Sequence, residues 1–99
     1  MTTPSDFFDC VGPVLEAGPK AQAVIAAIYQ LNKNVTIQDH HSYLRVYVPH
    51  HCVVTKSAVE KFLCQPFHLP ADLELMMPAF KGSLQITNEN AIWTLGETS

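Results

Sequence analysis

The sequence has little positive charge. It contains six lysines and arginines against nine aspartates and glutamates in 99 residues, which gives a formal net charge of −3. No two basic residues are adjacent, whereas nucleic-acid-binding domains carry clusters or stripes of Lys and Arg. We therefore expect no nucleic acid among the partners of this chain.

Long apolar runs are also lacking. No stretch approaches the roughly 20 residues that a membrane helix needs. The opening residues, MTTPSDFFDC, show no cationic segment followed by an apolar one, as a secretory leader would. The expectation is a cytoplasmic protein with no membrane partner.

Motifs for disulfide, metal or phosphate chemistry are missing as well. There are three cysteines, Cys10, Cys52 and Cys64. An odd number without CxxC spacing favours a reducing compartment over a disulfide framework. The histidine pairs at 40–41 and 50–51 fit no zinc spacing and fall where loops are expected. No GxSxG turn or glycine-rich phosphate loop occurs. We expect no metal and no catalytic site.

The chain does carry enough apolar residues for a folded core. Hydrophobic residues make up 47% of it, so 99 residues predict one domain, with residues 1–7 as a flexible N-terminal segment. Periodicity and breakers predict the elements, which are a strand over 8–15, a helix over 19–32, strands over 35–39, 43–48 and 52–54, a helix ending at 63, a helical turn over 71–73, and strands over 83–87 and 91–95. This order is typical of an α+β fold with mainly antiparallel sheet.

Three local features follow from the patterns. Gly12 and Pro13 predict an edge position or a bulge in the first strand, because proline lacks a ladder donor. Thr55 is placed to cap the second helix. The helices are expected to bury the following residues: Ala21, Val24, Ile25, Ile28 and Leu31 in the first, and Val59, Phe62 and Leu63 in the second.

One strand face and one apolar segment are candidates for binding. Alternation in YLRVYV turns Tyr43, Arg45 and Tyr47 away from the core, and Tyr and Arg are enriched among interface anchors. The alternative for Arg45 is an ordinary exposed strand cation. The segment ELMMPAFKG places methionines, a proline and a phenylalanine side by side between charged residues. Asp39, Arg45 and Glu74 are the polar residues set most deeply in apolar sequence.

The order of several motifs resembles one family. VGPVLEAG before a helix, NVTIQDHHSYLRV, LCQPFHLPADLEL, and MPAFKG before a final hairpin are similar to the effector, or coupling, proteins of bacterial multicomponent monooxygenases. The resemblance extends from Val11 to about Leu95. Cys64 departs from it, because the family commonly has glycine at that helix end.

The resemblance implies a fold, a function and a partner. The fold is a corner of two small sheets filled in with two or three helices. The protein would have no cofactor or catalysis of its own, would be a monomer when free, and would dock on the hydroxylase subunit that carries the diiron centre. Docking would tune substrate and oxygen access and couple reductant use to hydrocarbon oxidation.

The same resemblance assigns contact roles to one loop. Its residues here are Met76, Met77, Pro78, Ala79, Phe80 and Gly82. Some of these side chains, Met77 or Phe80 first, have core packing as an alternative role. A standard interface hides about 800 Å² on each partner, so Phe7, Phe8 and the Tyr43, Arg45 and Tyr47 face are further candidates.

Two other functions stay open at this point. A small hydrophobic-ligand-binding protein would have a closed internal cavity. A stand-alone enzyme would use His50, His51 or Cys52. Neither accounts as directly for an apolar segment bounded by Glu74 and Lys81.

Overall fold

A computed structural model describes residues 9–95 of the chain. Its elements in chain order are β1 (Cys10–Glu16), α1 (Pro19–Leu31), β2 (Thr36–Asp39), β3 (Tyr43–Pro49), β4 (His51–Thr55), α2 (Lys56–Leu63), α3 (Ala71–Met76), β5 (Ala79–Lys81), β6 (Ser83–Ile86) and β7 (Asn90–Thr94). No helix within these residues has the length and apolarity needed to span a bilayer.

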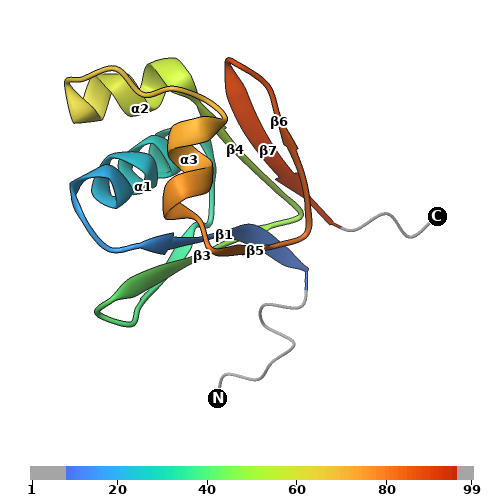
Figure 1. The fold of residues 1–99 in the computed structure, drawn as a ribbon. Coiled ribbons are helices and arrows are strands. Elements are labelled where there is room, and N and C mark those ends of the chain that lie inside the picture. Colours follow the sequence, from blue (N-terminus) through green and yellow to red (C-terminus); the bar gives the residue numbers. More distant parts are fainter. Residues whose placement is uncertain (1–8, 96–99) are drawn as a thin grey trace.

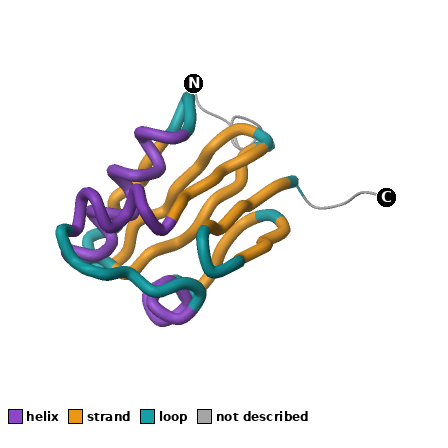
Figure 2. The backbone as a smooth tube through the Cα atoms, turned by 90° about the horizontal axis from the view of Figure 1, so that it is seen from above, coloured by secondary structure: helices purple, strands orange, loops and turns teal. Residues whose placement is uncertain are grey.

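The strands form two antiparallel sheets. One has four strands in the order β2-β3-β1-β5, and the other has three in the order β4-β7-β6. The three helices lie on one side of the four-stranded sheet (Figure 1), and seen from above they lie at the left and at the lower edge of the strands (Figure 2). The predicted α+β fold of two small sheets with helices is confirmed.

The chain changes sheet at two points. Only His50, with φ of 66°, separates β3 from β4, and only Gly82, with φ of 103°, separates β5 from β6. His50 also donates its backbone N–H to the Asp9 carbonyl at 2.7 Å, which fixes the first of these bends. The two bends connect the sheets at a corner.

The edge position predicted for Gly12 and Pro13 was wrong. β1 is an interior strand, since it pairs with β3 on one side and with β5 on the other. The proline is tolerated because the ladder with β3 passes from Val11 opposite Val48 to Val14 opposite Arg45 and is interrupted between them. A Cβ on Gly12 would lie 2.4 Å from the Val46 carbonyl oxygen, so the strands meet here at a distance that only glycine permits.

The core fills the angle between the sheets and the helices. Val11 and Leu15 of β1 and Leu44, Val46 and Val48 of β3 supply its sheet side. The other sheet adds further buried residues, which are Cys52, Val54, Ala91 and Trp93. Helix α1 buries Ala21, Val24, Ile25 and Ile28 as predicted, and also Ala23 and Ala27. Leu31 was wrongly assigned to this stripe, because it lies at the last helical residue and is 39% exposed.

Asn32 joins the end of α1 to the sheet edge. Its Nδ2 donates to the Val53 carbonyl at 2.8 Å, and its Oδ1 accepts from the Val53 N–H at 3.0 Å. Nδ2 also donates to the Ile28 carbonyl at 2.9 Å. The amide thus pairs with edge strand β4 as a neighbouring strand would, and it covers backbone groups that could otherwise pair with another chain.

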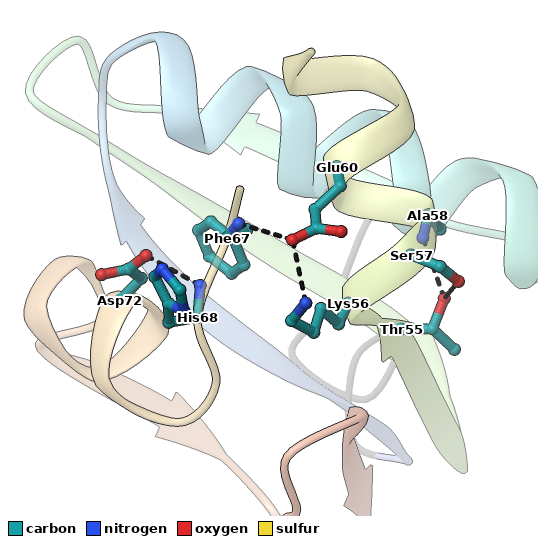
Figure 3. Close-up of polar contacts among 8 residues, drawn as sticks. All are labelled: Thr55, Lys56, Ser57, Ala58, Glu60, Phe67, His68 and Asp72. Atoms are coloured by element: carbon teal, nitrogen blue, oxygen red, sulfur yellow. Dashed lines mark hydrogen bonds and ion pairs between the residues drawn. The ribbon is translucent and has the colours of Figure 1, made fainter. Parts of the chain in front are cut away.

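Polar contacts fix α2 and the connection that follows it (Figure 3). The Thr55 hydroxyl accepts from the Ala58 N–H at 3.2 Å, which confirms the predicted cap. The Glu60 carboxylate accepts from the Phe67 N–H at 2.8 Å and pairs with Lys56 at 3.0 Å. Phe67 is thereby directed into the core, where it is fully buried.

Two details of this region depart from the predictions. Phe62 was assigned to the buried face of α2 but is 43% exposed, because the short helix buries only Ala58 and Val59. The helical turn predicted over 71–73 is a helix that extends to Met76. Cys64 ends α2 with φ of 62° and ψ of 29°, a left-handed conformation that suits the glycine common in the resembling family.

Candidate functional site

The side of the four-stranded sheet that faces away from the three helices carries predicted contact residues from two parts of the chain. In antiparallel sheets, directly opposite residues lie on the same face, and so do alternate residues along a strand. We call this side the outer face. By the observed register it includes Thr36 and Gln38 of β2, Tyr43, Arg45 and Tyr47 of β3, Val14 and Glu16 of β1, and Ala79 and Lys81 of β5.

Tyr43, Arg45 and Tyr47 lie on the outer face as predicted. Each is partly exposed, while Leu44, Val46 and Val48, which alternate with them along β3, are buried. The Arg45 guanidinium carbon lies 5.8 Å from the centre of the Tyr47 ring, a cation–π distance. The Tyr43 ring stacks on His40 with centroids 4.7 Å apart. The β3 side of the outer face is thus a row of packed, partly exposed aromatic and cationic groups.

The structure brings the two predicted contact regions together through β1. Val14 lies opposite Arg45 of β3 and, on its other side, opposite Ala79 of β5. Because of these pairings, the β3 row and the segment after α3 belong to one continuous surface. The sequence offered no signal for this union, since β5 has only three residues and pairs with a strand far away in the chain.

A hollow lies where these regions meet. It has a volume of about 530 Å³, is open to solvent, and is lined by Val14, Glu16, Ala17, Ser42, Tyr43 and Pro78. Only Tyr43 and Pro78 among these were predicted as site residues. The alternation of β1 contains a usable signal for Val14 and Glu16, because both fall on the side opposite buried Val11 and Leu15.

The segment from Met76 to Gly82 divides into buried and exposed parts. Met76 and Met77 belong to the hydrophobic core and are only 7% and 8% exposed. For these two residues the core-packing alternative therefore describes the free protein. Pro78, Ala79 and Phe80 are exposed. The segment is also not a simple loop, because Ala79–Lys81 form strand β5.

Phe80 differs from its neighbours in direction. It lies opposite Pro13, so alternation places it on the side away from Ala79 and Lys81. It is 44% exposed, since β5 is the edge strand. Phe80 therefore presents apolar surface at the rim of the sheet. Lys81 lies on the outer face and donates from Nζ to the Cys10 carbonyl at 3.0 Å.

Gly82 has an internal structural role. A Cβ at this position would lie 2.4 Å from the Thr94 carbonyl oxygen and 2.7 Å from Val11 Cγ1. The close approach that glycine permits here is thus to the chain's own β7 and β1. Phe7 and Phe8, the remaining contact candidates, lie outside the described residues.

A second open hollow adjoins the first. It has a volume of about 400 Å³, and its lining includes Gly18, Pro19, Lys20, Leu63 and Met76. Ala17 lines both hollows, so they lie on either side of the turn between β1 and α1. Sequence reasoning missed this hollow, because helix ends from separate parts of the chain create it.

Asp39, Cys52, His50 and His51 were the polar candidates for chemistry, and the structure shows the surroundings of each. Asp39 Oδ1 accepts from the His41 N–H at 2.7 Å and so stabilises the β2–β3 turn. Burial raises the pKa of the Cys52 thiol to about 12 and leaves little of the reactive thiolate, while His50 and His51 are exposed. Within residues 9–95, no group of three or more His, Cys, Asp or Glu side chains is placed to hold a metal ion.

The fold and this surface define a small α+β protein in which the described helices all cover the same face of the four-stranded sheet. The chain belongs to the MmoB/DmpM family, whose model matches residues 9–94. This confirms the resemblance found in the sequence. The chain is 34% identical over 85 residues to the effector subunit of the alkene monooxygenase system of Xanthobacter autotrophicus (strain ATCC BAA-1158 / Py2), covering 84% of this chain and 83% of that protein.

A solved structure shares the fold. The chain superimposes with a TM-score of 0.76 on a chain from the structure of a phenol hydroxylase–regulatory protein complex, covering 88% of this chain and 98% of the other. At 11% identity, this likeness establishes the architecture, with no transfer of individual residues.

Proposed function

We propose that this protein is the non-catalytic effector subunit of a multicomponent monooxygenase and that it docks on the hydroxylase subunit carrying the diiron centre. Family membership carries the proposal, together with a 34% identical relative that is itself an alkene monooxygenase effector subunit. The effector would tune substrate and oxygen access and couple electron transfer to hydrocarbon oxidation. Its location would be the cytoplasm, in keeping with the free thiols of Cys10, Cys52 and Cys64.

The docking surface in this proposal is the outer face with its rim. Tyr43, Arg45 and Tyr47 form one part, and Pro78, Ala79 and Phe80 form the other, with the 530 Å³ hollow between them. Tyrosine and arginine anchors beside apolar groups are the usual composition of binding hot spots. The two parts on one sheet also provide more area than a single loop, as an interface of about 800 Å² per partner requires.

Met76 and Met77 would contribute indirectly. Both side chains pack in the core, and both residues directly precede the exposed segment, which begins at Pro78. Their packing holds α3 and β5 in place, so that the exposed residues are ordered before docking. Less conformational entropy is then lost on association.

Acceleration by such an effector requires only a modest energy difference. A ligand shifts its partner's equilibrium only by binding one state better than another. A hundredfold faster reaction needs about 2.7 kcal/mol of preference for the productive state of the hydroxylase. One or two well-buried apolar contacts can supply this amount.

Phe80→Ala tests the docking segment. The substitution removes an exposed ring and should leave the fold intact, while the effector concentration for half-maximal activation of a cognate hydroxylase rises about tenfold. Steady-state turnover with reductase and reductant present gives this concentration. Tyr29→Ala is the matched control, because Tyr29 is an exposed aromatic residue on α1, on the helix side.

Two results would count against the proposal at different levels. Wild-type protein that neither binds a cognate hydroxylase nor changes its turnover would refute the effector function. Normal activation by Phe80→Ala would remove the rim of β5 from the docking surface and leave the function standing.

A further inference from the structure

Arg45 occupies the middle of the outer face. Its neighbours along β3 on this face are Tyr43 and Tyr47, and its partners across the sheet are Val14 of β1 and Gln38 of β2. The side chain is partly buried among them, with its guanidinium carbon 5.8 Å from the centre of the Tyr47 ring. The Arg45 cation therefore has two aromatic side chains, one apolar side chain and one amide as its neighbours on the sheet.

No anion within the chain neutralises this cation in the described structure. Among residues 9–95, the ion pair within salt-bridge distance is Lys56 with Glu60, on the helix side. Glu16 shares the outer face but lies opposite Tyr43, which is two residues from Arg45 along β3. Arg45 Nε is buried and has no hydrogen-bond acceptor among these residues. A buried hydrogen-bond donor without an acceptor is unfavourable. An acceptor supplied by a binding partner would therefore be favourable at Arg45.

We propose that Arg45 receives a carboxylate, the side chain of an aspartate or glutamate, from the docked hydroxylase. The inference rests on the proposed function and specifies the chemistry of the contact. Arginine presents a planar fork of N–H donors that matches the two oxygens of a carboxylate. Tyr43 and Tyr47 would exclude water from the pair, which strengthens it relative to an exposed ion pair.

The charge of the whole chain makes this contact selective. The protein has a formal net charge of −3, so an acidic partner surface is repelled at most approaches. The outer face carries the guanidinium of Arg45 and the ammonium of Lys81, so an acidic surface is favoured on this side of the sheet. A partner without the carboxylate would cover Arg45 and leave it buried and unpaired, which disfavours incorrect partners and incorrect registers.

Substitutions at Arg45 test the inference by binding. Arg45→Gln should raise the dissociation constant for the cognate hydroxylase about tenfold or more and should flatten its dependence on salt. Arg45→Lys keeps the charge but loses the fork, so it should recover only part of the affinity. Titration calorimetry at two NaCl concentrations measures both effects. Lys33→Gln, at an exposed lysine in the turn after α1, is the control and should bind like wild type.

A double-mutant cycle identifies the contact directly. Acidic residues on the hydroxylase face are replaced one at a time by their amides, and each variant is titrated with wild-type and Arg45→Gln effector. One position whose effect depends about fivefold or more on Arg45 supports the inference, even if the Arg45 variants are somewhat less stable. Absence of coupling at every acidic position overturns it.

The outcomes separate this inference from the function on which it rests. Wild-type affinity of Arg45→Gln, with weakened binding of Phe80→Ala, would overturn the carboxylate contact and preserve the effector function. Full recovery by Arg45→Lys would overturn the two-point geometry. If wild-type effector binds no cognate hydroxylase, the proposed function itself fails.

Discussion

The two faces of the four-stranded sheet are built from the same strands and have opposite compositions. On the inner face, Leu15 and Val46 are almost fully buried under the helices, whereas on the outer face Val14 and Arg45, their nearest neighbours in sequence, are partly exposed. Side chains alternate along a strand, so adjacent residues can serve separate purposes. The comparison suggests that stability depends mainly on the inner face and recognition on the outer one.

Leu15→Ala should have the largest effect on stability. Leu15 is fully buried, so truncation leaves a cavity and lowers the free energy of unfolding by about 3 kcal/mol. Urea unfolding measures the loss. Val14→Ala is the matched control one residue away and should cost less than about 1 kcal/mol. Equal losses at the two positions would contradict the division between the faces.

Tyr43→Ala should show the opposite pattern. Tyr43 lines the 530 Å³ hollow on the outer face, so its removal should weaken hydroxylase binding about tenfold. The free energy of unfolding should change by less than about 1 kcal/mol, because the side chain is already partly exposed. Tyr43→Phe keeps the ring and should retain most of the affinity. Unaltered binding by the alanine variant would exclude this part of the outer face from the interface.

Glu60 provides a smaller, pH-dependent test on the helix side. The hydrogen bond from the Phe67 N–H, followed by the contact with Lys56, lowers the pKa of the Glu60 carboxyl. A pKa that is lower in the folded state gives stability that is present above the unfolded pKa and is lost as pH falls through the folded pKa. Wild type should therefore exceed Glu60→Gln in stability at about pH 7, and the difference should shrink towards about pH 3.

Unfolding experiments across this pH range check the prediction, and a difference that grows in acid would refute it. Binding to the hydroxylase at neutral pH should be the same for both proteins, because Glu60 does not lie on the outer face. Weaker binding by the Glu60→Gln variant would show that the helix side also takes part in docking.

Local sequence signals predicted most of the fold. Period-two alternation identified the β2–β3 and β6–β7 hairpins, and Thr55 marked the start of α2, because these features depend on residues that are close in the chain. The interior position of β1 was not predicted, since Gly12 and Pro13 usually indicate an edge or a bulge. That proline is accommodated only because of an interrupted ladder, which is a tertiary feature.

The candidate site was predicted in pieces. Tyr43, Arg45 and Tyr47 were assigned from alternation, and the segment after α3 from the family resemblance, but their union needs the non-local pairing of β1 with β5. Met76 and Met77 show a second limit of sequence reasoning. In the sequence, an apolar residue beside an exposed segment looks the same whether it faces a partner or the core. Only the packing of α3 shows which of the two environments the residue has.

No side chain fits at Gly82, and this restricts how the protein can be engineered. Positions 79–81 can be randomised in a library that seeks effectors for other hydroxylases, because their side chains are exposed. Position 82 has to remain fixed, since even a methyl group would collide with the backbone of β7 and push the two sheets apart. A library that keeps this residue constant should yield a larger share of folded members.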